Sequence, residues 1–225
     1  MKILEIGRVD LASLCYLNKE RYPFLLESVN HNDKNRYSIL FAFPGKSIVL
    51  ENFSDFNFLS ELEDQFNANN ININLPFLGG WFVYLSYELI GQIEPILSEE
   101  LHTSELPIAY AVKIPSAIII DHKINTTFLM DKDSDQNRID TILADIDAIK
   151  PIPEVDVLGE LDHENEDKFI SGVKACLGYI VAGDVFQVNL SREWQYNLTK
   201  EIDSAIIYHA LKSANPAPFS ALVQH

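Results

Sequence analysis

Two pairs of short apolar runs, each pair interrupted by a turn signal, constrain the fold of this chain most. The first pair is 36–43 and 47–51, around Pro44-Gly45, and the second is 117–120 and 126–130, around a polar stretch. Runs of β-branched and aromatic residues around such turns are typical of hairpins. We therefore expect each pair to form neighbouring antiparallel strands, which argues against a parallel doubly wound sheet.

Helical repeats lie between and after these runs. Apolar residues recur at spacings of three and four in 10–20, 56–66, 139–149, 166–182 and 202–213. Further strand-like runs are 24–28, 81–87, 185–194 and 219–223. Gly79-Gly80 precedes 81–87 and suggests a buried strand that another backbone approaches closely. The predicted class is α+β, with largely antiparallel sheets and packed helices.

The composition shifts between residues 151 and 167, where two prolines and seven acidic residues gather. Such stretches are typical of linkers. We expect a first domain over 1–150, an acidic linker over 151–165 and the start of a second domain over 166–225. The last strand-like run reaches nearly to the end of the chain, so we expect the second domain to be incomplete.

The charge excludes some partners. Asp and Glu number 33 against 17 Lys and Arg, which gives a formal charge of −16 and repels nucleic acids and anionic membranes. Apolar stretches are far shorter than the roughly 20 residues of a membrane span. Cys15 and Cys176 lie on apolar helical faces, as free thiols do, and the start of the chain lacks a signal-peptide pattern. These features predict a cytoplasmic protein.

Local motifs for catalysis are missing from the sequence. No Walker loop, Gly-x-Gly-x-x-Gly or Gly-x-Ser-x-Gly pattern is present, and the six histidines lie far from one another, with no Cys or carboxylate partner at metal-ligand spacing. We therefore assign no metal site. The alternation over 185–194 puts Gln187, Asn189 and Ser191 on one strand face, which either lines a hydrogen-bonding cleft or faces water.

Four segments together carry a family resemblance. They are Leu25-Leu26-Glu27-Ser28 with Asn35-Arg36-Tyr37, then 79–88, 182–191 and 215–220. In this order and spacing the chain resembles component I of aminodeoxychorismate synthase and, more distantly, component I of anthranilate synthase. The resemblance covers essentially the whole chain, and Ala-Gly-Asp-Val-Phe-Gln-Val-Asn-Leu-Ser at 182–191 is its most specific part. The segments 81–89 and 91–95 favour the aminodeoxychorismate branch.

The resemblance implies a two-layer architecture and a transferase that aminates chorismate. In that family a glutamine amidotransferase subunit supplies ammonia, Mg²⁺ assists, and the product, 4-amino-4-deoxychorismate, leads to para-aminobenzoate and folate. The family's catalytic lysine, its acid–base glutamate and its Mg²⁺-binding glutamates lie beyond the Asn-Pro-x-Pro-Phe segment. We therefore assign no catalytic residue and no metal ligand, and expect the isolated chain to be inactive.

Related chains form a tryptophan pocket between the Leu-Leu-x-Ser segment and the Asn-Pro-x-Pro-Phe turn. The matching residues are Ser28, Lys34, Asn35, Arg36, Tyr37, Pro218, Phe219 and Ser220. An amino-acid zwitterion needs donors, acceptors and a flat apolar slot, and this set offers all three. In the alternative interpretation, Tyr37 and Phe219 are ordinary packing residues.

Three functional hypotheses remain open from the sequence. In the first, the chain is part of a chorismate-aminating enzyme of the aminodeoxychorismate or the anthranilate branch. In the second, it is a non-catalytic tryptophan-binding relative. In the third, it is a split-gene fragment that binds its missing half or an amidotransferase.

Overall fold

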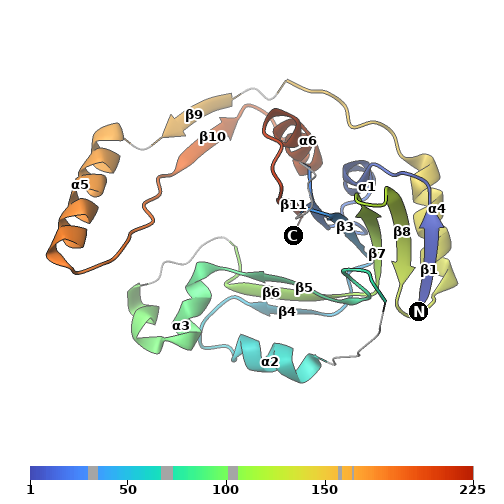
Figure 1. Ribbon diagram of the computed structural model, residues 1–225, viewed down its shortest axis with the longest axis horizontal. Coiled ribbons are helices and arrows are strands. Elements are labelled where there is room, and N and C mark those ends of the chain that lie inside the picture. The colour runs from blue at the N-terminus through green and yellow to red at the C-terminus, as the bar shows by residue number, and fades with distance from the viewer. Residues whose placement is uncertain (30–34, 67–72, 101–105, 157–158, 164, 225) are drawn as a thin grey trace. The chain divides into compact units, whose positions relative to one another are not determined.

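The computed structural model of this chain describes residues 1–29, 35–66, 73–100, 106–156, 159–163 and 165–224 (Figure 1). It separates into two compact units. The first unit comprises Met1–Pro153 and Ser204–His225, and the second unit is Glu154–Asp203. Each unit is described below by itself. The predicted family domain boundary at 151–165 stays a prediction.

A six-stranded sheet forms the centre of the first unit. Its order is β1 (Lys2–Ile6), β8 (Thr126–Asp131), β7 (Ser116–Asp121), β3 (Tyr37–Ala42), β2 (Phe24–Glu27) and β11 (Ser220–Val223). Every neighbouring pair is antiparallel. The hairpin predicted around 121–125 is present as β7–β8, and the predicted class of antiparallel sheets with packed helices is confirmed.

The hairpin predicted around Pro44-Gly45 is wrong. The strand that follows the turn belongs to a second, three-stranded sheet of order β4 (Ser47–Leu50), β6 (Ala109–Ile114) and β5 (Gly80–Leu85). Phe43 has a φ of 57°, in the left-handed region, and the next residues leave the first sheet. The N–H of Gly45 donates to the carbonyl of Lys113, which ties the chain to β6 instead.

The predicted burial of 81–87 is also only partly right. Phe82 is buried, but Val83, Leu85 and Tyr87 are exposed, and β5 lies at the edge of the three-stranded sheet. Gly79 has a φ of 87°, and a Cβ there would lie 2.7 Å from the side chain of Lys132. The close neighbour of the glycine pair is therefore a side chain and not a backbone.

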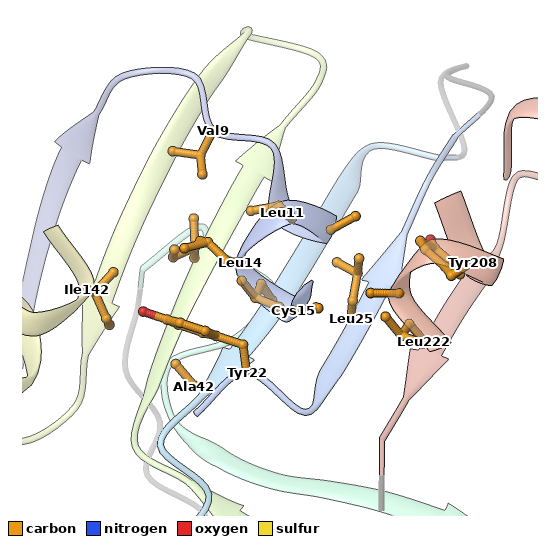
Figure 2. Packing of buried hydrophobic residues seen from close by; sticks show 14 of the residues in the cluster. Val9, Leu11, Leu14, Cys15, Tyr22, Leu25, Ala42, Ile142, Tyr208 and Leu222 are labelled. Atoms are coloured by element: carbon orange, nitrogen blue, oxygen red, sulfur yellow. The ribbon is translucent and has the colours of Figure 1, made fainter. Parts of the chain in front are cut away.

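Three helices cover one face of the six-stranded sheet. They are α1 (Leu11–Leu17), α4 (Gln136–Ala148) and α6 (Ser204–Ala214). Figure 2 shows Leu14 and Cys15 of α1 over the sheet, with Tyr208 of α6 on one side and Ile142 of α4 on the other. The hydroxyl of Tyr22 reaches the carboxylate of Asp145 in α4 at 2.6 Å.

The opposite face of the six-stranded sheet packs against the three-stranded sheet. Phe24 and Phe82 stack with ring centroids 4.1 Å apart, and Phe41 meets Phe82 edge to face. The helix α2 (Phe58–Gln65) covers the far side of the smaller sheet through buried Phe58. Shorter helical turns follow β5, namely η1 (Tyr87–Leu89), α3 (Ile90–Ile93) and η2 (Pro95–Glu100).

The second unit consists of a two-stranded antiparallel sheet and one helix. The strands are β9 (Gly159–His163) and β10 (Trp194–Leu198), and the helix α5 (Glu166–Ala182) has the predicted bounds. The side chain of Asn165 caps the start of α5 at 2.7 Å, and Gly183 ends it at a φ of 82°. None of the residues whose burial is described in this unit is buried.

The strand predicted over 185–194 is wrong. Residues 185–193 are neither helix nor strand, and pairing begins only at Trp194. A strand requires a hydrogen-bonded neighbour, and in the described part of this unit β9 pairs with 194–198. Gln187, Asn189 and Ser191 are exposed and do not share a strand face.

Among the described residues, no helix has both the length and the apolar character that crossing a bilayer requires.

Candidate ligand-binding site

The two segments proposed to form a pocket lie side by side at one edge of the six-stranded sheet. In the β2–β11 ladder, Ser220 pairs with Glu27 and Ala221 with Leu26. Beyond the ladder, the N–H of Val29 donates to the carbonyl of Ala217 at 3.2 Å. The turn at 215–218 therefore lies beside the residues that follow β2.

A pocket of about 490 Å³ opens where these segments meet β3. Its lining residues are Leu26, Glu27, Ser28, Asn35, Arg36, Tyr37, Ile39, Pro76, Phe219, Ser220 and Ala221. Six of the eight predicted site residues are among them. Pro218 precedes the lining segment without forming part of it, and Lys34 lies outside the described residues.

Much of the pocket wall is apolar. Leu26, Ile39 and Ala221 come from three adjacent strands, and Leu26 faces away from Leu25, which packs under the helices. Phe219 is 81% exposed and Leu26 is 40% exposed, so both offer apolar surface to a ligand. Leu26, Ile39 and Ala221 were not among the site residues predicted from the sequence. Each lies two residues from a predicted one, namely Ser28, Tyr37 and Phe219, and in a strand this spacing puts both side chains on the same face.

Ser28 has a defined hydrogen-bonding role in the pocket. Its hydroxyl donates to the carbonyl of Tyr37 at 2.9 Å, and its N–H donates to the hydroxyl of Ser38 at 3.1 Å. Since its proton is used, the oxygen of Ser28 is left to accept from a ligand. An ammonium group is the kind of partner that this oxygen suits.

Arg36 is paired within the protein. Its Nε and Nη2 donate to the two carboxylate oxygens of Asp121 at 2.9 and 2.5 Å. The guanidinium carbon also lies 4.7 Å from the centre of the Tyr37 ring. The hydrogen bonds from Arg36 to Asp121 lower the pKa of Asp121 and raise the pKa of Arg36. The pocket thus presents a guanidinium whose charge is largely compensated.

Glu27 directs its carboxylate to the helix-covered face. It accepts hydrogen bonds from the hydroxyl of Tyr208 at 2.8 Å and from Nζ of Lys212 at 3.2 Å. These contacts fix α6 to the strand edge that holds the pocket. Burial, and then the nearby carboxylate of Glu27, raise the pKa of Tyr208. A lone acid in an otherwise apolar strand was the sequence signal for this role.

The described residues offer binding groups and no catalytic set. Burial raises the pKa of the Cys15 thiol to about 12, so it remains protonated and unreactive. Within the described ranges, no three or more His, Cys, Asp or Glu side chains are arranged so that they could hold a metal ion. The acids Asp131, Asp133 and Asp135 lie close together, but each is paired with Arg138. Such an arrangement does not fit Mg²⁺.

Comparisons with known proteins agree with this fold. Residues 22–225 match the family model described as chorismate binding enzyme. An anthranilate synthase component I-like protein of Synechocystis is 29% identical over 201 residues, which are 86% of this chain and 41% of that protein. Aminodeoxychorismate synthase component 1 of Bacillus subtilis is 29% identical over 161 residues, 66% of this chain and 34% of that protein.

A solved structure shows the same fold. Anthranilate synthase component I of Streptococcus pneumoniae superposes with a TM-score of 0.65 at 20% identity, covering 84% of this chain and 48% of that one. The chain therefore spans about half or less of the length of the relatives it matches.

Proposed function

Because the chain belongs to the chorismate binding enzyme family, we propose that it serves in the amination of chorismate as an aminodeoxychorismate synthase component I-like chain. We further propose that the 490 Å³ pocket binds tryptophan. The observation that carries the proposal of tryptophan binding is that Phe219, which is distant in sequence from Ser28 and Tyr37, lines the same pocket as these two residues.

The pocket suits a neutral zwitterion with a flat ring. Leu26, Ile39 and Phe219 provide apolar surface, while the oxygen of Ser28 accepts from an ammonium group. Chorismate carries two carboxylates and needs uncompensated cations. Arg36 is compensated by Asp121, so the pocket favours tryptophan over chorismate.

The choice of branch rests on the segments 81–89 and 91–95. In the structure Gln92 ties this region to α2, since its side-chain amide donates to the carbonyls of Phe53 and Phe56 and accepts from the N–H of Phe58. Relatives named for both branches are similar to this chain.

In the complete reaction, ammonia would come from a glutamine amidotransferase subunit. Mg²⁺ would assist that reaction, and we assign none of its ligands to the described residues.

Thermal unfolding of the 225-residue chain tests the pocket. Tryptophan should raise the melting temperature in proportion to ln(1 + [L]/Kd), while chorismate at the same concentration should not. At about 100 times Kd the stabilisation is roughly 2.7 kcal/mol. Absence of any shift with millimolar tryptophan would overturn the proposed pocket.

A blocking variant locates the binding. Ser28 is a poor choice because it is 5% exposed and hydrogen-bonded, so Ala221→Phe is preferable at an exposed strand position. It should abolish the tryptophan shift without lowering the baseline stability. The matched control is Val223→Phe, two residues along β11, which lines a different cavity of about 620 Å³ and should retain the shift.

Complementation tests the branch. The 225-residue chain expressed alone should restore neither auxotroph, because its described residues contain no catalytic set. The gene expressed together with its downstream DNA should restore growth of a para-aminobenzoate auxotroph and not of a tryptophan auxotroph. Rescue of the tryptophan auxotroph alone would favour the anthranilate branch. Rescue of neither, together with tryptophan binding, would favour the non-catalytic tryptophan-binding hypothesis.

A further inference from the structure

We propose that Asp121, which does not line the pocket, is a positioning residue that acts through Arg36 to hold the ring of Tyr37 and to keep the pocket electrically neutral. This inference rests on the proposed tryptophan site and deepens it. It concerns which ligands the site accepts.

The sheet register brings the three residues together. Asp121 at the end of β7 lies directly opposite Tyr37 at the start of β3. Arg36 precedes Tyr37, and its guanidinium reaches back to the carboxylate of Asp121 through two hydrogen bonds. The carboxylate is 2% exposed and the Arg36 side chain 29% exposed. The acid is therefore the buried, fixed partner of the pair.

The carboxylate itself is oriented by the β7–β8 turn. The N–H of Lys123 donates to its Oδ1 at 3.0 Å. A guanidinium bound through two parallel hydrogen bonds has a defined plane. Its central carbon consequently stays 4.7 Å from the centre of the Tyr37 ring, where a cation attracts the ring face. Tyr37 also packs against buried Ala117, Ile119 and Met130. The ring is thus held from two sides.

The pair of Asp121 and Arg36 also sets the net charge of the pocket. An arginine beside a pocket attracts carboxylates unless an acid compensates it. Asp121 provides that compensation, so a ligand gains little from a net negative charge. Tryptophan is a zwitterion, whereas indole-3-propionate has the same ring and a carboxylate but no ammonium group. The wild-type site should therefore prefer tryptophan, and loss of the Asp121 charge should reduce this preference.

Asp121→Asn tests the proposal because it keeps the shape and an acceptor for Lys123 but removes the charge. We expect tryptophan affinity to fall about three- to tenfold, as loss of a fixed cation–aromatic contact implies. Affinity for indole-3-propionate should rise, because Arg36 becomes available to its carboxylate. A purely structural role of Asp121 would lower stability without changing the ratio of the two affinities.

The chain offers a matched control. Asp131 in β8 forms the same two-bond pair with Arg138, at 2.7 and 3.1 Å, and is 0% exposed. Neither residue lines the pocket. Asp131→Asn should lower stability at least as much as Asp121→Asn and leave both affinities within about twofold of the wild type.

A ligand-free readout keeps this inference separate from the proposed function. The chain has nine tyrosines, and the signal of Tyr37 in fluorotyrosine-labelled protein is assigned by its loss in Tyr37→Phe. Asp121→Asn should shift this fluorine signal, while Asp131→Asn should not.

The outcomes are distinct. An unchanged affinity ratio in Asp121→Asn, or an equal change in Asp131→Asn, overturns the proposal. Failure of the wild type to bind tryptophan overturns the proposed function instead. In that case the Tyr37 fluorine signal decides the inference, and a signal unaffected by Asp121→Asn overturns it.

Discussion

The helices α4 in the first unit and α5 in the second carry the same kind of apolar repeat but have opposite environments. Ile139 and Ile142 of α4 are 1% and 0% exposed in the core beneath the six-stranded sheet. Ile170 and Leu177 of α5 are 47% and 57% exposed. The longer repeat is therefore the less buried one. Periodicity predicts a helix and the face it would bury, but not the partner that buries it.

The difference extends to the units as wholes. The first unit stacks two sheets with helices on both sides and buries large side chains such as Tyr22, Phe24 and Phe58. The second unit has a two-stranded sheet and one helix, with no buried residue among those whose burial is described. Elements of this size are marginal in water without packing. We therefore expect the second unit to open far more readily than the first.

Amide hydrogen exchange should show the largest contrast. Amides of β7, whose residues 116–119 are buried, should exchange only on global unfolding, since burial and pairing on both sides protect them. Relative to their intrinsic rates, amides of α5 should exchange about a thousandfold faster than those of β7, or faster still, because α5 opens locally. The helix α4 is the control and should resemble β7. Equal protection of α5 and β7 would break the comparison.

Truncation of a single leucine should show the next largest effect. Leu40→Ala removes a side chain that is 0% exposed and should lower the free energy of unfolding by about 3 kcal/mol. Leu177→Ala makes the same chemical change in α5 and should cost less than about 0.5 kcal/mol. Urea denaturation measures both. A comparable loss in the two variants would mean that the second unit has a core of its own.

The pH dependence of stability sharpens the comparison further, because the first unit holds a fully buried carboxylate. Burial alone would raise the pKa of Asp131, but hydrogen bonds from Arg138 and Ser116 outweigh it and lower the pKa to about 2. Since the folded value is below the unfolded value of 3.8, this stabilisation is present above about pH 4 and is lost as pH falls towards 2.

Asp131→Asn tests this assignment. The variant should be less stable than the wild type by about 2 kcal/mol at pH 7, and the difference should shrink as pH falls towards 2. Denaturation in urea at several pH values measures it. A difference that stays constant down to pH 2 would contradict the assignment to this carboxylate.

The candidate site was predictable in part. The segments around Ser28 and Phe219 were brought together by their family resemblance, and they do line one pocket. Asp121 was not predictable, because its bond to Arg36 spans 85 residues and depends on the register of β7 against β3. The apolar lining residues Leu26 and Ala221 face the pocket only because β11 pairs with β2.

The sequence by itself determined the local structure of this protein. The apolar repeat of α5 and its cap at Gly183 set that helix, and the polar turn at 121–125 set the β7–β8 hairpin, because both depend on neighbouring residues. Tertiary structure alone decided that β4 joins the smaller sheet and that 185–193 forms no strand. Strand pairing and burial depend on partners distant in the chain, and local periodicity carries no information about where those partners lie.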